Sequence, residues 1–176
     1  MFVCKQWFQG PGQIGRIAKQ KNRPRSEGYF SGTEEHPLNK TLVLSATLEN
    51  LETLIAHASS FATDNGMDPK LVYQVELSLE EVLVNVISYA YPEGTQGNVE
   101  VNCSWEVRQG LTLEVVDYGE AFDPLAKPDP DTSLSLDERS IGGLGIFLTK
   151  KMMDKVTYDR CQGKNILTLI KHCQTS

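Results

Sequence analysis

The sequence has no apolar run that approaches the roughly 20 residues that a helix needs to cross a bilayer. Its first residues, MFVCKQWFQGPGQIG, lack the continuous apolar segment of a secretory signal peptide. The four cysteines show neither CxxC spacing nor an accompanying histidine pattern, so we expect reduced thiols and no cysteine-based metal site. These absences argue against a membrane-spanning or disulfide-framework protein, and they predict a cytoplasmic one.

Positive charge is scarce outside the first part of the chain. Residues 1–35 carry six Lys and Arg against three Glu, a net charge of +3, whereas residues 36–176 carry eleven Lys and Arg against twenty Asp and Glu, a net charge of −9. Nucleic-acid binding draws much of its affinity from neutralised phosphates, so the acidic body predicts no direct nucleic-acid contact. The basic stretch KQKNRPRS (19–26) could touch nucleic acid or a membrane, but we interpret it as a solvated tail.

The length of 176 residues leaves room for one domain with a sizeable core but not for two ordinary ones. Residues 1–38 are rich in Gly, Pro, Lys and Gln, and we predict that they form a poorly ordered basic extension. We expect residues 39–174 to form the single folded domain.

Apolar periodicity predicts the elements of this domain. The Asn65-Gly66 pair marks the end of one helix and Asp68-Pro69 the start of the next. The predicted elements are a strand over 41–47, helices over 48–64 and 68–90, strands over 99–106 and 111–116, a helix over 145–153, and strands over 156–160 and 166–171. This order indicates an α+β fold, a two-layer α/β sandwich in which helices cover one face of a mixed, mostly antiparallel sheet.

The second helix carries two polar residues in an apolar setting. In EEVLVN (80–85), Glu81 and Asn85 are four residues apart and therefore share one helix face, whereas Glu80 points about 100° away. Such a pair is most often part of a solvated surface. Here the neighbouring side chains are Val, Leu and Ile, and a polar pair inside a buried helix needs partners. We therefore interpret Glu81 and Asn85 as a candidate functional pair.

Two further stretches place polar residues and glycines at element ends. VVDYGEAFDP (115–124) closes an apolar strand, and SIGGLGIFLTKKMMD (140–154) opens a helix with glycines. Glycines before a helix expose backbone N–H groups, and the helix dipole adds partial positive charge, so this start favours phosphate. A GGxG stretch alone also occurs in ordinary turns.

In this order the three stretches resemble the N box, G1 box and G2 box of the GHKL (Bergerat-fold) ATP-binding superfamily. The small size and the tail QGKNILTLIK (162–171) look most like its anti-sigma-factor serine/threonine protein kinases, and the resemblance runs from roughly Thr41 to Lys171. It implies a kinase that uses ATP and Mg²⁺ to phosphorylate a serine on a STAS-domain anti-sigma-factor antagonist. It also implies binding to an RNA polymerase sigma factor, partner switching between the two, and a homodimer.

The same resemblance implies roles for individual residues. Glu81 would be the general base and Asn85 the Mg²⁺ ligand, while Asp117 would accept a hydrogen bond from the adenine amino group. From the sequence itself we predict that Arg139, the cation nearest the glycines, reaches the γ-phosphate, although a surface ion pair with a neighbouring carboxylate is the alternative. The implied ATP-binding residues are Asn85, Asp117, Gly119, Ala121, Arg139, Gly142, Gly143, Leu144, Gly145 and Ile146.

Three departures from the family pattern keep a second function open. Tyr89 stands where these kinases usually have His, and Ala121 replaces the second glycine of the G1 box. The stretch 48–65 contains no Lys or Arg, although relatives often use an Arg there for partner contact. A phenol cannot carry the positive charge of a histidine. The alternative is a nucleotide-binding interaction module with little or no kinase turnover.

Overall fold

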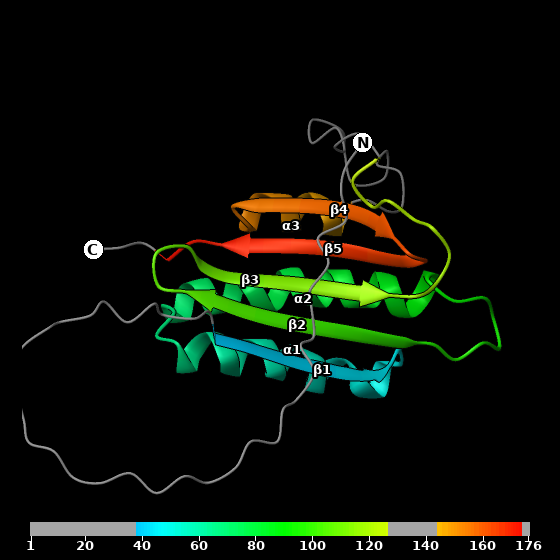
Figure 1. Cartoon of the computed structure of the whole chain (residues 1–176), viewed down its shortest axis with the longest axis horizontal. Helices are drawn as coiled ribbons and strands as arrows, with labels where there is room; N and C mark the ends of the chain where they lie inside the picture. The colour runs from blue at the N-terminus through cyan, green and yellow to red at the C-terminus, as the bar shows by residue number, and fades with distance from the viewer. Residues whose placement is uncertain (1–37, 127–143, 174–176) are drawn as a thin grey trace, which may run out of the picture. The chain divides into compact units, whose positions relative to one another are not determined.

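The computed structural model describes residues 38–126 and 144–173. These residues form, in order, β1 (Leu38–Ser45), α1 (Leu48–Asp64), α2 (Pro69–Tyr89), β2 (Asn98–Glu106), β3 (Gly110–Asp117), α3 (Leu144–Met152), β4 (Lys155–Cys161) and β5 (Lys164–Lys171) (Figure 1). The predicted order of helices and strands is therefore confirmed. Residues 1–37 of the predicted basic extension lie outside the described residues, Leu38 begins β1, and the division into extension and domain stays a prediction.

The strands form one sheet in the order β1-β2-β3-β5-β4, and Figure 1 shows α1, α2 and α3 together behind one face of it. The predicted α+β class and its two layers are confirmed. The sheet differs in one detail, because all four described pairings are antiparallel rather than mixed. Short turns join β2 to β3 and β4 to β5, and strands joined by a tight turn pair antiparallel.

The two long helices begin and end at local signals. The side chain of Asn65 donates to the carbonyl of Phe61 (2.8 Å), and Gly66 follows with a φ of +83°, a conformation that favours glycine. Asp68 accepts a hydrogen bond from the backbone of Lys70 (2.8 Å) ahead of Pro69 at the first helical turn. No helix among the described residues is long and apolar enough to span a membrane.

The core lies between the helices and the covered face of the sheet. Burial alternates along β2 and β5, as expected for strands with one covered face. The fully buried large side chains include Leu54, Leu79, Leu83, Leu111, Leu113 and Leu169. At the end of α2 the carbonyl of Ala90 accepts a hydrogen bond from the backbone of Glu120 (2.9 Å), which ties this helix to the loop after β3.

The cysteines differ in their oxidation state. Cys103 and Cys173 are free thiols, as predicted. Cys161 is disulfide-bonded, so the expectation of a reduced thiol is wrong for this residue. Cys4 lies outside the described residues.

Cys103 is expected to be nearly inert towards alkylating reagents. It is 2 % exposed, and burial raises the pKa of its thiol to about 12. At about pH 8 the reactive thiolate is then on the order of 10⁻⁴ of the population. We expect labelling by iodoacetamide, followed by peptide mass spectrometry, to be at least ~100-fold slower in the native protein than in denaturant. Labelling of native Cys103 as fast as that of the more exposed Cys173 would contradict this.

Candidate functional site

A hollow of about 480 Å³, including the part that is open to solvent, lies where the second half of α2 meets the end of β3, the start of β5 and the first turn of α3. Three of the predicted site residues line it from three different elements: Asn85 from α2, Asp117 from β3 and Ile146 from α3. Much of the remaining wall is apolar or aromatic, including Val86 and Phe122. An apolar pocket with a few convergent polar groups is the usual form of a small-molecule site.

Asp117 is the polar group at the end of β3, and it is only 5 % exposed. Its Oδ1 accepts two hydrogen bonds, from the backbone of Gly119 (2.9 Å) and from Nδ2 of Asn165 (2.8 Å). Within the described part of the chain no hydrogen bond reaches the other oxygen, Oδ2. Because Asp117 lines the hollow, Oδ2 can accept a hydrogen bond from a bound molecule.

Gly119 is required by a close approach of two backbones. A Cβ at this position would overlap the carbonyl oxygen of Ala90 and lie 2.5 Å from its carbonyl carbon. The loop after β3 therefore passes directly against the end of α2. Neither Gly119 nor Ala121 lines the hollow, and Ala121 is exposed, whereas Glu120 and Phe122 on either side of Ala121 do line it.

Glu81 lies against the first turn of α3. A Cβ at Gly145 would overlap Oε2 of Glu81 and lie 2.7 Å from its carboxyl carbon, so glycine leaves room for this carboxylate in the rotamer that it adopts. A negative charge near a helix N-terminus is favourable. Glu81 and Asn85 thus share the face of α2 that their spacing predicts. Leu144, by contrast, is 44 % exposed and does not line the hollow.

Three of the predicted site residues, Arg139, Gly142 and Gly143, lie outside the described residues. Their roles, including the reach of Arg139 to the γ-phosphate, stay predictions.

Asn165 is the functional residue that the sequence reasoning missed. It is 6 % exposed at the start of β5, and its side chain contacts Asp117, Glu120, Tyr158 and Arg160. Burial raises the pKa of the Tyr158 phenol, so this group stays a hydrogen-bond donor at neutral pH. One signal could have found Asn165: it occupies an inward position of a strand whose next inward residues are leucines. A polar residue at a core-facing position needs partners.

The possible metal ligands that the structure describes near the hollow are too few to hold a metal ion by themselves, but they suit a metal ion that arrives bound to a nucleotide. No group of three or more His, Cys, Asp or Glu in residues 38–126 and 144–173 could hold a metal ion. Asn85 offers one neutral oxygen, and Mg²⁺ is commonly bound by few protein groups together with substrate phosphates. Asn85 is therefore the residue that would hold Mg²⁺ delivered with a nucleotide.

Comparisons with known proteins agree with this geometry. The profile of the family described as "Histidine kinase-like ATPase domain" matches residues 44–171. The serine/threonine-protein kinase BtrW of Bordetella bronchiseptica is 29% identical over 132 residues, which cover 75% of this chain and 92% of that protein. The serine-protein kinase RsbW of Bacillus subtilis is 29% identical over 113 residues, which cover 61% of this chain and 69% of that protein.

A solved structure shows the same fold. The crystal structure of the RsbU and RsbW domains of a Mycobacterium tuberculosis protein superposes with a TM-score of 0.52 at 15% identity, covering 78% of this chain and 32% of that longer one. The family match confirms the resemblance seen in the three motifs, and membership implies ATP binding. With the fold, the hollow and the profile in agreement, the chain belongs to the histidine kinase-like ATPase domain family.

Proposed function

We propose that this protein is an anti-sigma factor that uses ATP to phosphorylate a serine or threonine on a STAS-domain antagonist, and that it regulates transcription by partner switching. The observation that carries the proposal is the arrangement of Glu81 and Asn85 on one face of α2, beside the first turn of α3 and the hollow that Asp117 closes. The names of two similar proteins, both serine or serine/threonine kinases, support the reaction class.

Each side chain has a defined task in this reaction. Asp117 accepts the hydrogen bond of the adenine amino group through Oδ2, and Asn85 would hold Mg²⁺ through its amide oxygen. Glu81 takes the proton from the attacking hydroxyl as the new O–P bond forms, and ADP leaves as the bond to the γ-phosphorus breaks. The first turn of α3 offers backbone N–H groups to the phosphates, because the first four of a helix have no internal partner.

The proposed partners are an RNA polymerase sigma factor, the STAS-domain antagonist and a second copy of the chain, all in the cytoplasm. The edge of the sheet at β1 supports a protein contact, because among the described residues β1 pairs with β2 alone and exposes Leu38 (58%) and Val43 (48%). We assign no direct nucleic-acid or membrane partner. Sedimentation equilibrium checks the homodimer, and a monomer at micromolar concentration would contradict it.

One observation favours the second candidate, a nucleotide-binding interaction module with little turnover. Tyr89 lines the hollow with 73 % of its surface exposed, one turn beyond Asn85. A neutral phenol there supplies no positive charge next to the phosphates, whereas a protonated histidine would.

Asn85→Ala is expected to lower phosphoryl transfer by about 100-fold or more, because the metal loses its protein ligand. The measurement is single-turnover transfer of labelled γ-phosphate from ATP·Mg²⁺ to candidate STAS proteins. Label on a partner serine or threonine with the wild type, lost in this variant, supports the kinase. Nucleotide binding without transfer to any candidate favours the interaction module, and the absence of ATP binding overturns both functions.

A further inference from the structure

The register of the sheet places Asn165 directly opposite one residue on each of the two neighbouring strands. It pairs directly with Asp117 of β3 on one side and with Arg160 of β4 on the other. Directly opposite residues in antiparallel strands have side chains close enough to interact. Asn165 therefore lies between Asp117 and a cation on the edge strand, and both Asn165 and Asp117 line the hollow.

The hydrogen bonds determine which way the amide of Asn165 points. Its Nδ2 donates to two acceptors, Oδ1 of Asp117 (2.8 Å) and the carbonyl of Glu120 (2.8 Å). Its Oδ1 accepts from two strong donors, the hydroxyl of Tyr158 (2.7 Å) and Nη1 of Arg160 (2.7 Å). A reversed amide would place donors against donors and acceptors against acceptors. By donating to Oδ1 of Asn165, Arg160 and Tyr158 thus keep the NH₂ group of Asn165 directed at Asp117.

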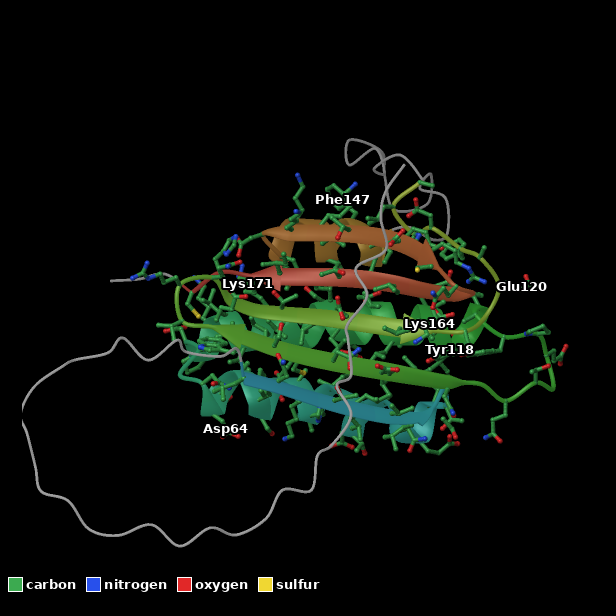
Figure 2. The ribbon with its side chains drawn as sticks, viewed as in Figure 1. Asp64, Tyr118, Glu120, Phe147, Lys164 and Lys171 are labelled. Atoms are coloured by element: carbon green, nitrogen blue, oxygen red, sulfur yellow. The ribbon has the colours of Figure 1, made fainter. Side chains whose placement is uncertain are left out.

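The same hairpin holds the loop that follows Asp117. Arg160 also donates to the carbonyl of Gly119 (3.0 Å). The ammonium of Lys164 lies 5.1 Å from the ring centre of Tyr118. Figure 2 shows these two side chains together, at the end of the sheet where Glu120 is also labelled. Residues of β4 and β5 therefore hold the loop at two adjacent residues, Tyr118 and Gly119.

Consequently one oxygen of Asp117 is occupied by protein donors, whereas the other has no donor among the described residues and can accept one from a ligand. Oδ1 is held by Gly119 and Asn165, which prevents rotation of the carboxylate. A site built to hydrogen-bond one group of a ligand rejects an analogue without that group more strongly when its own polar atom cannot find another partner.

We propose that Asn165, oriented by Arg160, is the positioning residue that sets base selectivity in this site, by holding Asp117 with one free oxygen towards the 6-amino group of a purine nucleotide. This inference rests on the proposed nucleotide site. It assigns the selectivity to the β4–β5 hairpin in addition to the end of β3 that carries Asp117.

The test compares the affinity for ATP with that for purine riboside 5′-triphosphate, which lacks the 6-amino group, both with Mg²⁺, by calorimetric titration. We expect the wild type to prefer ATP by about tenfold or more. Asn165→Ala is expected to weaken ATP binding by about tenfold and binding of the analogue by less than about threefold, so that most of the preference is lost. Thr168→Ala, on the same strand but the other face, is the matched control and is expected to keep the wild-type preference.

The variant Asn165→Asp tests whether Asn165 acts through its hydrogen bond to Asp117 or only by filling space. It keeps the side-chain size and the acceptor for Arg160, but it replaces the donor to Asp117 with a second carboxylate oxygen, and like charges in contact repel. The preference is again expected to fall. If either buried variant fails to fold, Arg160→Ala is measured instead, because the side chain of Arg160 is exposed and its loss leaves the core intact. We expect this variant to lose about threefold of the preference for ATP over the analogue.

The outcomes distinguish this inference from the function on which it rests. A wild-type preference that survives in the folded variants, whatever their absolute affinities, overturns the role of Asn165 and leaves the proposed function standing. A wild type that binds both nucleotides equally overturns the reading of the amino group by Asp117 and, with it, this inference. A wild type that binds neither overturns the nucleotide site itself.

Discussion

Glu81→Gln is expected to lower the single-turnover rate of phosphoryl transfer by about 10³-fold without weakening ATP binding. The amide has the size of the carboxylate but cannot take up the proton of the attacking hydroxyl. The carboxylate of Glu81 lies against Gly145 at the first turn of α3, close to where phosphates would bind. Removing its charge also removes a repulsion of the nucleotide, so ATP affinity is expected to stay equal or rise. Transfer rate and dissociation constant are measured on the same preparation.

Glu80→Gln is the matched control for this experiment. It changes the same residue type at the adjacent helix position, which is also exposed but lies about 100° around the helix from Glu81. Its transfer rate is expected to stay within about twofold of the wild type, since surface charges away from the site act weakly. If Glu81→Gln transfers phosphate as fast as the wild type, Glu81 is not the general base. A slow variant that also loses ATP would assign it to binding instead.

Gly119→Ala is expected to destabilise the domain by about 3 kcal/mol, or roughly 10 °C in Tm. The added Cβ would overlap the carbonyl oxygen of Ala90, and backbone atoms at the end of a packed helix cannot yield cheaply. The loop would have to move away from α2. That movement would also break the hydrogen bond from Gly119 to Asp117, so ATP affinity is expected to fall as well. Thermal unfolding followed by circular dichroism measures the first effect.

Gly145→Ala provides the contrasting control. Its Cβ would overlap a carboxylate oxygen of Glu81, which is the far end of a flexible side chain. We therefore expect a loss of less than about 1 kcal/mol in stability, because a side chain can change rotamer at little cost. Transfer is expected to fall, because the proposed base is displaced. Equal stability of Gly119→Ala and wild type would show that the contact with Ala90 is not rigid.

Local patterns in the sequence were sufficient for the elements and for three of the residues that line the hollow, Asn85, Asp117 and Ile146. Asp68-Pro69 and Asn65-Gly66 mark helix ends because capping and glycine chemistry act within a few residues. Glu81 and Asn85 share a helix face because the helical repeat is the same wherever a helix forms. The expectation of a mixed sheet was wrong in detail, because the relative direction of paired strands depends on which distant segments pair.

The sequence by itself determined the fold class, the helix pair and the polar stretches that point to a nucleotide. Only the tertiary structure decided how they meet: Asn165 reaches Asp117 across 48 residues, Gly119 lies against Ala90, and Gly145 lies against Glu81. These contacts depend on the register of β5 beside β3 and on the packing of α2 against α3. Neighbouring residues of a strand face opposite sides, so a slip of one residue would turn Asn165 away from Asp117. No local pattern specifies that register.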